Sequence, residues 1–285
     1  MAKRRIQASK VERAVMRYHG GKWLLAQWLV EHFPPHRIYV EPFGGAASVL
    51  MQKARSYGEV YNDLDSEIVN VFRVLRDTTH AKEIERVIRL TPYARDEFDL
   101  AYQPTDDPVE LARRTLTRAF MGFGSASATK GHRTGWRANV KKSGTTPAID
   151  WQRYPDHIAQ FTARLQGVTI ENRDAHHVIT AHDAPDTLMY VDPPYPFATR
   201  YQNAKWRACY KHELTDDMHR DLAATLRAVK GMVVVSGYRC DLYDVLYSDW
   251  ASYERATFAD NAEARTEVVW LNARAVKGLS QQSLF

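Results

Sequence analysis

Residues 187–195 read Thr-Leu-Met-Tyr-Val-Asp-Pro-Pro-Tyr, an apolar run followed at once by a carboxylate, two prolines and an aromatic ring. The first five residues have the apolar, β-branched composition of a buried strand, and Pro193 and Pro194 end it because they lack backbone donors. Asp192 is therefore expected at the carboxyl end of a strand, where open α/β sheets bind ligands. The Asp192 carboxylate, the Pro193 carbonyl and the Tyr195 ring together suit the amino group of a planar base.

Strands and helices alternate on both sides of this run. Further strands are predicted at residues 37–41, 59–62, 168–171 and 232–236, with a closing hairpin near 253–257 and 266–271. Helices are predicted at residues 46–55, 66–75, 154–165 and 215–229.

The alternation stops between residues 76 and 160, where only helices are predicted, with starts at Thr91-Pro92 and Asp107-Pro108. The fold class is therefore α/β, a doubly wound Rossmann-like sheet with a mostly helical insertion.

The composition is that of a globular protein, with 285 residues, 45% of them hydrophobic, and a formal net charge of +5. No apolar run is long enough to span a bilayer and no signal core follows the basic N-terminus, so a soluble, cytoplasmic protein is expected. Cys209 and Cys240 lack metal-type spacing, and the histidines near residues 176–182 have no partner at ligand spacing. No metal site is predicted.

Positive charge is concentrated between residues 111 and 149, where the sequence contains no Asp or Glu. The second half of this segment, residues 122–147, is rich in Gly, Ser and Thr and has no helical or strand periodicity. A long basic loop with interleaved aromatic residues favours phosphate binding. Its candidate DNA-binding residues are Arg113, Arg114, Arg118, Lys130, Arg133, Arg137, Asn139, Lys141 and Lys142.

A glycine-containing turn, Glu41-Pro42-Phe43-Gly44-Gly45, follows the first predicted strand. Glycines there let the backbone approach a ligand closely. The turn is neither Gly-x-Gly-x-x-Gly nor a Walker motif, so pyrophosphate or triphosphate binding is poorly supported. Asp63 follows the second strand, where an acidic residue accepts from a ribose hydroxyl. Together with Asp192 these residues predict one crevice.

Taken together, these motifs resemble those of the Dam-type DNA adenine-N6 methyltransferases, in the family's order and over nearly the whole chain. Tyr18-His-Gly-Gly-Lys22, the segment 40–48 and Asn62-Asp63 resemble the elements that contact S-adenosylmethionine, and Asp174 resembles the residue near its adenine. Asp192-Pro193-Pro194-Tyr195 resembles the catalytic motif. Arg265-Thr-Glu267 resembles a late element to which no role is assigned.

The resemblance implies a class I methyltransferase that transfers a methyl group from S-adenosylmethionine to N6 of a flipped-out adenine in double-stranded DNA. Residues 1–75 and 161–285 would form the catalytic, cofactor-binding domain, and residues 76–160 the inserted target recognition domain. Arg137-Ala-Asn139 and Gly144-Thr-Thr-Pro147 match the family's recognition segment only in part. A bacterial or phage-encoded, DNA-associated monomer is expected, with restriction-modification as one setting.

The C-terminal peptide Gln281-Gln-Ser-Leu-Phe285 resembles the short motifs with which bacterial DNA-processing proteins dock on the replication sliding clamp. Leu284 and Phe285 would be the apolar anchors, presented after a flexible connection at Lys277-Gly278.

Two alternatives stay open on the residues alone. One is an amino methyltransferase acting on cytosine N4 or on adenine in RNA. The other is a non-catalytic DNA-binding or clamp-associated protein on a methyltransferase fold.

Overall fold

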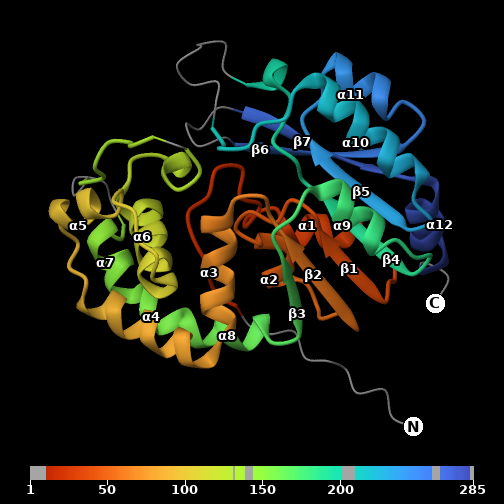
Figure 1. The fold of residues 1–285 in the computed structure, drawn as a ribbon. Helices are drawn as coiled ribbons and strands as arrows, with labels where there is room; N and C mark the ends of the chain where they lie inside the picture. The colour runs from red at the N-terminus through yellow and green to blue at the C-terminus, as the bar shows by residue number, and fades with distance from the viewer. Residues whose placement is uncertain (1–10, 131, 139–143, 201–208, 259–263, 283–285) are drawn as a thin grey trace, which may run out of the picture.

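The structure is a computed structural model that describes residues 11–130, 132–138, 144–200, 209–258 and 264–282 (Figure 1). Its seven-stranded sheet has the order β3-β2-β1-β4-β5-β7-β6. The strands are β1 (Ile38–Glu41), β2 (Gly58–Asn62), β3 (Val168–Glu171), β4 (Thr187–Val191), β5 (Met232–Gly237), β6 (Ala251–Phe258) and β7 (Ala264–Leu271). β1 to β5 pair in parallel, while β7 is antiparallel to both β5 and β6. The predicted strands and the closing hairpin are confirmed.

The strand order reverses between β1 and β4. β1 pairs with β2 on one side and with β4 on the other, with Val40 opposite Met189. In a doubly wound sheet the crevice at such a reversal, outside the carboxyl ends of the strands, binds the ligand. The topology therefore places Glu41 and Asp192 at the same crevice.

Helices cover both faces of the sheet (Figure 1). Leu188 and Tyr190 of β4 belong to the apolar cluster on one face, and Met189 and Val191 belong to the cluster on the other, because successive side chains of a strand alternate. The first face is covered by α1 (Ala26–Glu31), α2 (Ser48–Gln52), α3 (Ser66–Arg76) and α12 (Ala273–Gln282). The second is covered by α9 (Ala175–Ala181), α10 (Asp216–Ala228) and α11 (Asp241–Leu246).

The segment between β2 and β3 is helical, as expected, and lies to one side of the sheet (Figure 1). It contains α4 (Thr78–Leu90), α5 (Arg95–Leu100), α6 (Pro108–Met121), η1 (Ser125–Ser127), α7 (Pro147–Arg153), η2 (Tyr154–His157) and α8 (Ile158–Leu165). Phe120, Tyr154 and Phe161 of this segment share one apolar cluster with Phe72 of α3. The helical segment is thus anchored on the sheet through α3 rather than around a separate core.

Side-chain hydrogen bonds and backbone angles near the helix ends explain which predicted helix boundaries hold. Asp107 caps α6 by accepting from the Val109 and Glu110 amides, with Pro108 in the first turn, so this start is confirmed. The predicted start at Thr91-Pro92 is wrong, because Thr91 ends α4, donates its hydroxyl to the Val87 carbonyl, and the next helix begins at Arg95. The helix expected over residues 46–55 spans only Ser48–Gln52: it starts after Ala47, which adopts a left-handed φ of 53°, and ends at Lys53, whose backbone is extended.

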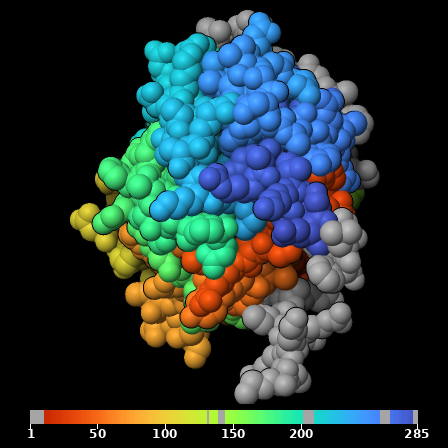
Figure 2. Space-filling model, turned by 90° about the vertical axis from the view of Figure 1, so that its right-hand side faces the viewer, coloured from red at the N-terminus to blue at the C-terminus, as the bar shows by residue number. Residues whose placement is uncertain are grey.

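α12 corrects the flexible connection expected at Lys277-Gly278, since both residues lie inside this helix. A Cβ on Gly278 would lie 2.7 Å from Pro34 Cβ, so the glycine permits close helix packing. α12 (dark blue) lies against the orange-red N-terminal elements in Figure 2. Gln281 is in its last turn, and residues 283–285 lie outside the described residues.

No helix among the described residues is long and apolar enough to cross a membrane.

Candidate active site

A cavity of about 960 Å³ lies at the carboxyl ends of β1 and β4. Its lining comes from the segment before α1, the turn after β1, the residues after β2 and β4, the loop after α6, and β7. Thirteen predicted site residues line this one cavity: Tyr18, Lys22, Glu41, Phe43, Gly44, Gly45, Asp63, Lys130, Arg133, Asp192, Pro193, Pro194 and Tyr195. The fold thus brings together motifs from both halves of the chain.

The turn after β1 needs glycine for two separate reasons. A Cβ on Gly44 would lie 2.2 Å from the Tyr61 ring, and the Gly44 amide donates to the Asn62 carbonyl at 2.7 Å. Gly45 has a φ of +48°, which L side chains rarely adopt, and a Cβ there would lie 2.7 Å from the Tyr18 ring. The turn therefore packs closely between β2 and the N-terminal segment and exposes backbone toward the cavity.

Asp63 organises this turn as well as lining the cavity. Its Oδ2 accepts from the Gly45 amide at 2.8 Å and its Oδ1 from the Asp65 amide at 2.9 Å. Burial raises the pKa of Asp63 to about 6, although these two hydrogen bonds act in the opposite direction. Sequence reasoning assigned Asp63 a ligand hydroxyl but missed this role in shaping the turn.

Glu41, at the end of β1, is a buried carboxylate that faces the cavity. Its Oε1 accepts from both the Tyr39 hydroxyl at 2.6 Å and the Leu50 amide at 2.8 Å. Within the described part of the chain Oε2 has no hydrogen-bonding partner, although the side chain is only 2% exposed. Burial raises the pKa of Glu41 to about 7, with the hydrogen bonds and Lys53 opposing and Asp192 adding to the rise. Such a group favours a cationic ligand.

Asp192 uses one carboxylate oxygen for the protein and keeps the other for the cavity. Oδ1 accepts from Lys22 Nζ at 3.0 Å and from the Ser236 hydroxyl at 2.9 Å. The Tyr190 hydroxyl lies 3.0 Å from the Ser236 oxygen and extends this chain of contacts. No described residue makes a hydrogen bond or ion pair with Oδ2, so this oxygen is available to accept from a ligand.

Lys22 is a buried cation held by several groups. Nζ donates to the Gly20 carbonyl at 2.7 Å, lies 3.0 Å from Asp192 and 3.9 Å from Glu267, and is 4.8 Å from the centroid of the Tyr195 ring. Burial lowers the pKa of Lys22, but the charges of Asp192 and Glu267 outweigh burial and raise it overall. The lysine stays protonated.

The Tyr195 ring borders the cavity and is held on several sides. Its hydroxyl donates to Glu267 Oε1 at 2.5 Å, and Tyr238 packs edge to face against it at 4.9 Å between centroids. Arg200 Nη2 donates to the Tyr195 carbonyl at 2.6 Å. Burial raises the pKa of the Tyr195 hydroxyl well above its usual value, with Asp192 and Glu267 adding to the effect.

Two predicted cofactor residues do not line the cavity. The Asp174 side chain is exposed and caps α9 by accepting from the His176 amide at 2.9 Å. The Pro42 carbonyl accepts from Asn62 Nδ2 at 2.8 Å, and this hydrogen bond ties the turn after β1 to the end of β2.

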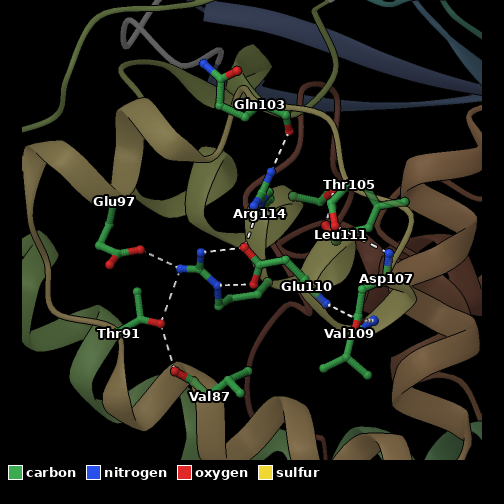
Figure 3. A network of polar contacts seen from close by, with 12 residues as sticks. Val87, Thr91, Glu97, Gln103, Thr105, Asp107, Val109, Glu110, Leu111 and Arg114 are labelled. Atoms are coloured by element: carbon green, nitrogen blue, oxygen red, sulfur yellow. Dashed lines mark hydrogen bonds and ion pairs between the residues drawn. The ribbon is translucent and has the colours of Figure 1, made fainter.

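Three of the predicted DNA-binding arginines form ion pairs and hydrogen bonds within the protein. Arg113 is 6% exposed and pairs with Glu97 and Glu110 at 2.7 and 2.6 Å. Arg114 pairs with Glu110 and donates to the Gln103 carbonyl, as Figure 3 shows. Arg118 is also buried; it donates to the Ala101 carbonyl at 2.6 Å and pairs with Glu67 of α3. Each of the three is thus paired with a carboxylate of the protein, and at most 12% of each side chain is exposed.

The other basic residues lie in the loop after α6. This loop is closed at its base by a bridge between Gly122 and Trp136, and the Phe123 amide donates to the Gly135 carbonyl at 2.6 Å. Lys130 and Arg133 line the cavity, and Arg133 also pairs with Asp99. Arg137 lies at the base, where its amide donates to the Met121 carbonyl. Asn139, Lys141 and Lys142 lie outside the described residues.

Sequence reasoning missed Ser236, which contacts the predicted catalytic motif, and assigned no role to Glu267 of the Arg265-Thr-Glu267 element, which contacts the motif as well. Ser236 ends the apolar run of β5, the neighbour of β4, and Glu267 precedes the buried run Val268 to Leu271 of β7. In each case the sequence offered one signal, a polar residue next to the apolar run of a predicted strand. Their contacts with Asp192 and Tyr195 depend on strand order, which no local pattern reports.

Comparisons with known proteins identify the family of the chain. A family model described as D12 class N6 adenine-specific DNA methyltransferase matches residues 18–261. A DNA adenine methylase of Vibrio cholerae serotype O1 is 25% identical over 199 residues, which cover 67% of this chain and 68% of the relative. A DNA adenine methylase of Serratia marcescens is 21% identical over 190 residues, covering 65% and 68%.

Proposed function

Because the chain belongs to the D12 class N6 adenine-specific DNA methyltransferase family, we propose that the cavity at β1 and β4 is its active site. There a methyl group passes from S-adenosylmethionine to the N6 amino group of an adenine in DNA. The observation that carries this assignment is the geometry of Asp192, whose Oδ1 is held by Lys22 and Ser236 while Oδ2 is left for a ligand.

The residues present fit the methyl donor. S-adenosylmethionine carries an ammonium and a sulfonium, and Glu41, a buried side chain at the cavity, uses Oε1 for its hydrogen bonds to the described residues and leaves Oε2 for a ligand. The turn at Gly44 and Gly45 brings backbone to the cavity wall where a side chain would clash. Glu41, Asp63 and this turn would hold the donor, and Tyr18 would border it. When bound, the donor supplies an electrophilic methyl group on sulfur.

Asp192 and Pro193 orient the amine. An exocyclic amino group on a purine is a poor nucleophile, because its lone pair is delocalised into the ring. Hydrogen bonds from its two N–H groups to Asp192 Oδ2 and the Pro193 carbonyl favour a pyramidal nitrogen with a usable lone pair. Lys22 and Ser236 hold the carboxylate in place for this contact, so the site supplies orientation and electrostatic stabilisation.

Tyr195 provides the surface for the base. A base within a duplex cannot reach the cavity, so the target adenine leaves the stack and packs against an aromatic ring. The ring borders the cavity beside Pro194 and is backed by Lys22 and Tyr238.

Residues 76–160 are the proposed target recognition segment, inserted in a catalytic domain of residues 1–75 and 161–285. Support comes from the loop after α6, which borders the cavity with Lys130 and Arg133. Arg113, Arg114 and Arg118 are left out of the proposed interface because at most 12% of each side chain is exposed and each is paired with a carboxylate. Arg133 also pairs with a carboxylate, that of Asp99, but its side chain is 53% exposed.

The activity test uses purified protein, S-adenosylmethionine and unmethylated duplex DNA, with nucleosides identified by mass spectrometry. N6-methyladenine is expected, and Asp192→Ala should lower its formation by at least about 100-fold with the fold intact. Asp217→Ala, at an exposed aspartate of α10, is the matched control and should keep wild-type activity. N4-methylcytosine, or methylation of RNA alone, would overturn the proposal, as would substantial activity in Asp192→Ala.

Clamp docking by residues 281–285 and a monomeric state stay predictions. The docking peptide would start from the last turn of α12, with Leu284 and Phe285 as its anchors. A pull-down with purified sliding clamp tests it: binding should be lost when residues 281–285 are deleted, and persistence of binding would remove the peptide as its cause.

A further inference from the structure

We propose that Glu267 of β7 is a positioning residue for methyl transfer, which sets the orientation of the Tyr195 ring through its hydroxyl. This inference rests on the proposed function, since Tyr195 matters only if a base stacks on it. Neither the catalytic motif nor the cofactor elements include Glu267.

The contact that carries the proposal is the hydrogen bond from the Tyr195 hydroxyl to Glu267 Oε1 at 2.5 Å. Among the described residues, Tyr238 also packs edge to face against the ring, and the Lys22 ammonium lies 4.8 Å from its centroid. Packing contacts of this kind tolerate rotation of a ring, whereas a hydrogen bond at the far end of the side chain fixes its direction.

Tyr195 needs such a contact because it lies in the irregular segment between β4 and η3 (Phe197–Thr199). Pro193 and Pro194 fix the preceding φ angles, and Arg200 holds the Tyr195 carbonyl at 2.6 Å, so the backbone is anchored. The side-chain torsions are not set by these contacts. Glu267, from the closing hairpin, anchors the opposite end of the side chain.

Glu267 occupies a position where a carboxylate is costly. It is 2% exposed and precedes the fully buried Val268 and Val269. Burial raises the pKa of Glu267 to about 7, with Lys22 opposing the rise and Asp192 adding to it. A buried carboxylate is usually kept only with specific partners, and perturbed groups of this kind concentrate at functional sites.

Distances separate this role from a simple ion pair with Lys22. The ammonium lies 3.0 Å from Asp192 Oδ1 but 3.9 Å from Glu267 Oε1, so Asp192 is its hydrogen-bonding carboxylate. Tyr195 is the partner within hydrogen-bond distance of Glu267. The carboxylate therefore acts on the reaction through the tyrosine.

A double-mutant cycle between Glu267→Ala and Tyr195→Phe tests the proposal. Each single change removes the same hydrogen bond and should lower kcat by about 10- to 100-fold, the loss expected for a charge-assisted bond. KM for DNA should change by less than about threefold, because phosphate contacts lie elsewhere. The double variant should lie within about threefold of either single variant, since the bond is lost only once.

Three further variants and probes complete the experiment. Glu267→Gln keeps an acceptor oxygen and should recover most of the activity lost in Glu267→Ala. Glu254→Ala removes an exposed carboxylate of the neighbouring strand β6 and is the matched control, expected to match the wild type. In a duplex with 2-aminopurine at the adenine that the wild type is found to methylate, Glu267→Ala and Tyr195→Phe should shift the fluorescence lifetimes alike.

The proposal is overturned if Glu267→Ala lowers kcat by the same factor in the Tyr195→Phe background as in the wild type. If Glu267→Ala does not fold, the test rests on Tyr195→Phe, which removes only one oxygen atom, and on Glu267→Gln. Full activity in Tyr195→Phe would then overturn the positioning role of Glu267. Failure of the proposed function is a separate result, because then the wild type itself forms no N6-methyladenine.

Discussion

Gly44→Ala tests whether the turn after β1 is shaped by close packing against β2. A Cβ at this position would lie 2.2 and 2.5 Å from two carbons of the Tyr61 ring and 2.9 Å from the Asn62 carbonyl oxygen. Favourable carbon contacts lie near 3.5–4.0 Å, so the ring or the turn must shift by more than about 1 Å.

Neither group has room to move. The Tyr61 ring is fully buried, packs on Phe72 at 4.4 Å, and donates its hydroxyl to the Gly45 carbonyl at 2.7 Å. Overpacking of this kind costs about 1–3 kcal/mol, which lowers Tm by roughly 2–10 °C in a protein of this size. Because the turn borders the cavity, a shift of this size should also weaken S-adenosylmethionine binding by about tenfold or more.

Thermal unfolding and calorimetric titration with S-adenosylmethionine measure the two effects. Gly58→Ala is the matched control, since its Cβ would meet Ile38 at ordinary contact distances of 3.7 and 4.0 Å. The control should keep the wild-type cofactor affinity and equal or slightly exceed the wild-type Tm, because alanine costs less than glycine in a strand. A Gly44→Ala protein with wild-type Tm and wild-type cofactor affinity would refute the packing argument.

Three other perturbations have expected outcomes. Since burial raises the pKa of Asp63 to about 6, cofactor affinity should fall as the pH drops through this value and the carboxylate takes up a proton. In calorimetric titrations of Asp63→Asn, cofactor affinity should no longer change with pH near 6. If that pH dependence persists, it belongs to another group. Arg164→Met removes a fully buried partner that pairs with Glu59 at 2.6 Å. Because Lys53 still lies 2.9 Å from Glu59, urea unfolding should show a loss of about 1.5–3 kcal/mol, the contribution of hydrogen bonds to a charged group; a loss below about 1 kcal/mol would contradict the role of this pair. Lys130→Ala and Arg133→Ala should each weaken DNA binding in fluorescence anisotropy and reduce the slope of log K against log salt by about 1, whereas unchanged slopes would remove them from the interface.

Much of the fold follows from local patterns. Apolar, β-branched runs and turn residues located the strands, and the aspartate-proline pair at residue 107 marked the start of α6. The start expected at Thr91 failed because the threonine hydroxyl bonds back to Val87 and ends the preceding helix. A threonine can stand either at the start or at the end of a helix, and tertiary packing decides between the two.

The position of the proposed catalytic residues was predictable for a related reason. Asp192 follows an apolar strand and precedes two prolines, so its place at the carboxyl end of a strand depends on its immediate neighbours alone. Family membership, inferred from these motifs and their order, is confirmed by the match over residues 18–261. The basic surface inferred from residues 111–149 was not predictable in this way. Arg113 and Arg118 are buried against glutamates that lie outside this acid-free segment.

The sequence by itself determined the strand ends, the glycine turn and the chemistry of the Asp192-Pro193-Pro194-Tyr195 motif, since each depends on backbone preferences and neighbouring residues. Only the tertiary structure decided which arginines are buried in ion pairs and which side chains support the motif. Ser236 and Glu267 reach Asp192 and Tyr195 across strands that are paired through the sheet, over separations of 44 and 72 residues. Pairing at that range is set by the packing of the whole sheet, because no local preference encodes which distant carboxylate will face a given ring.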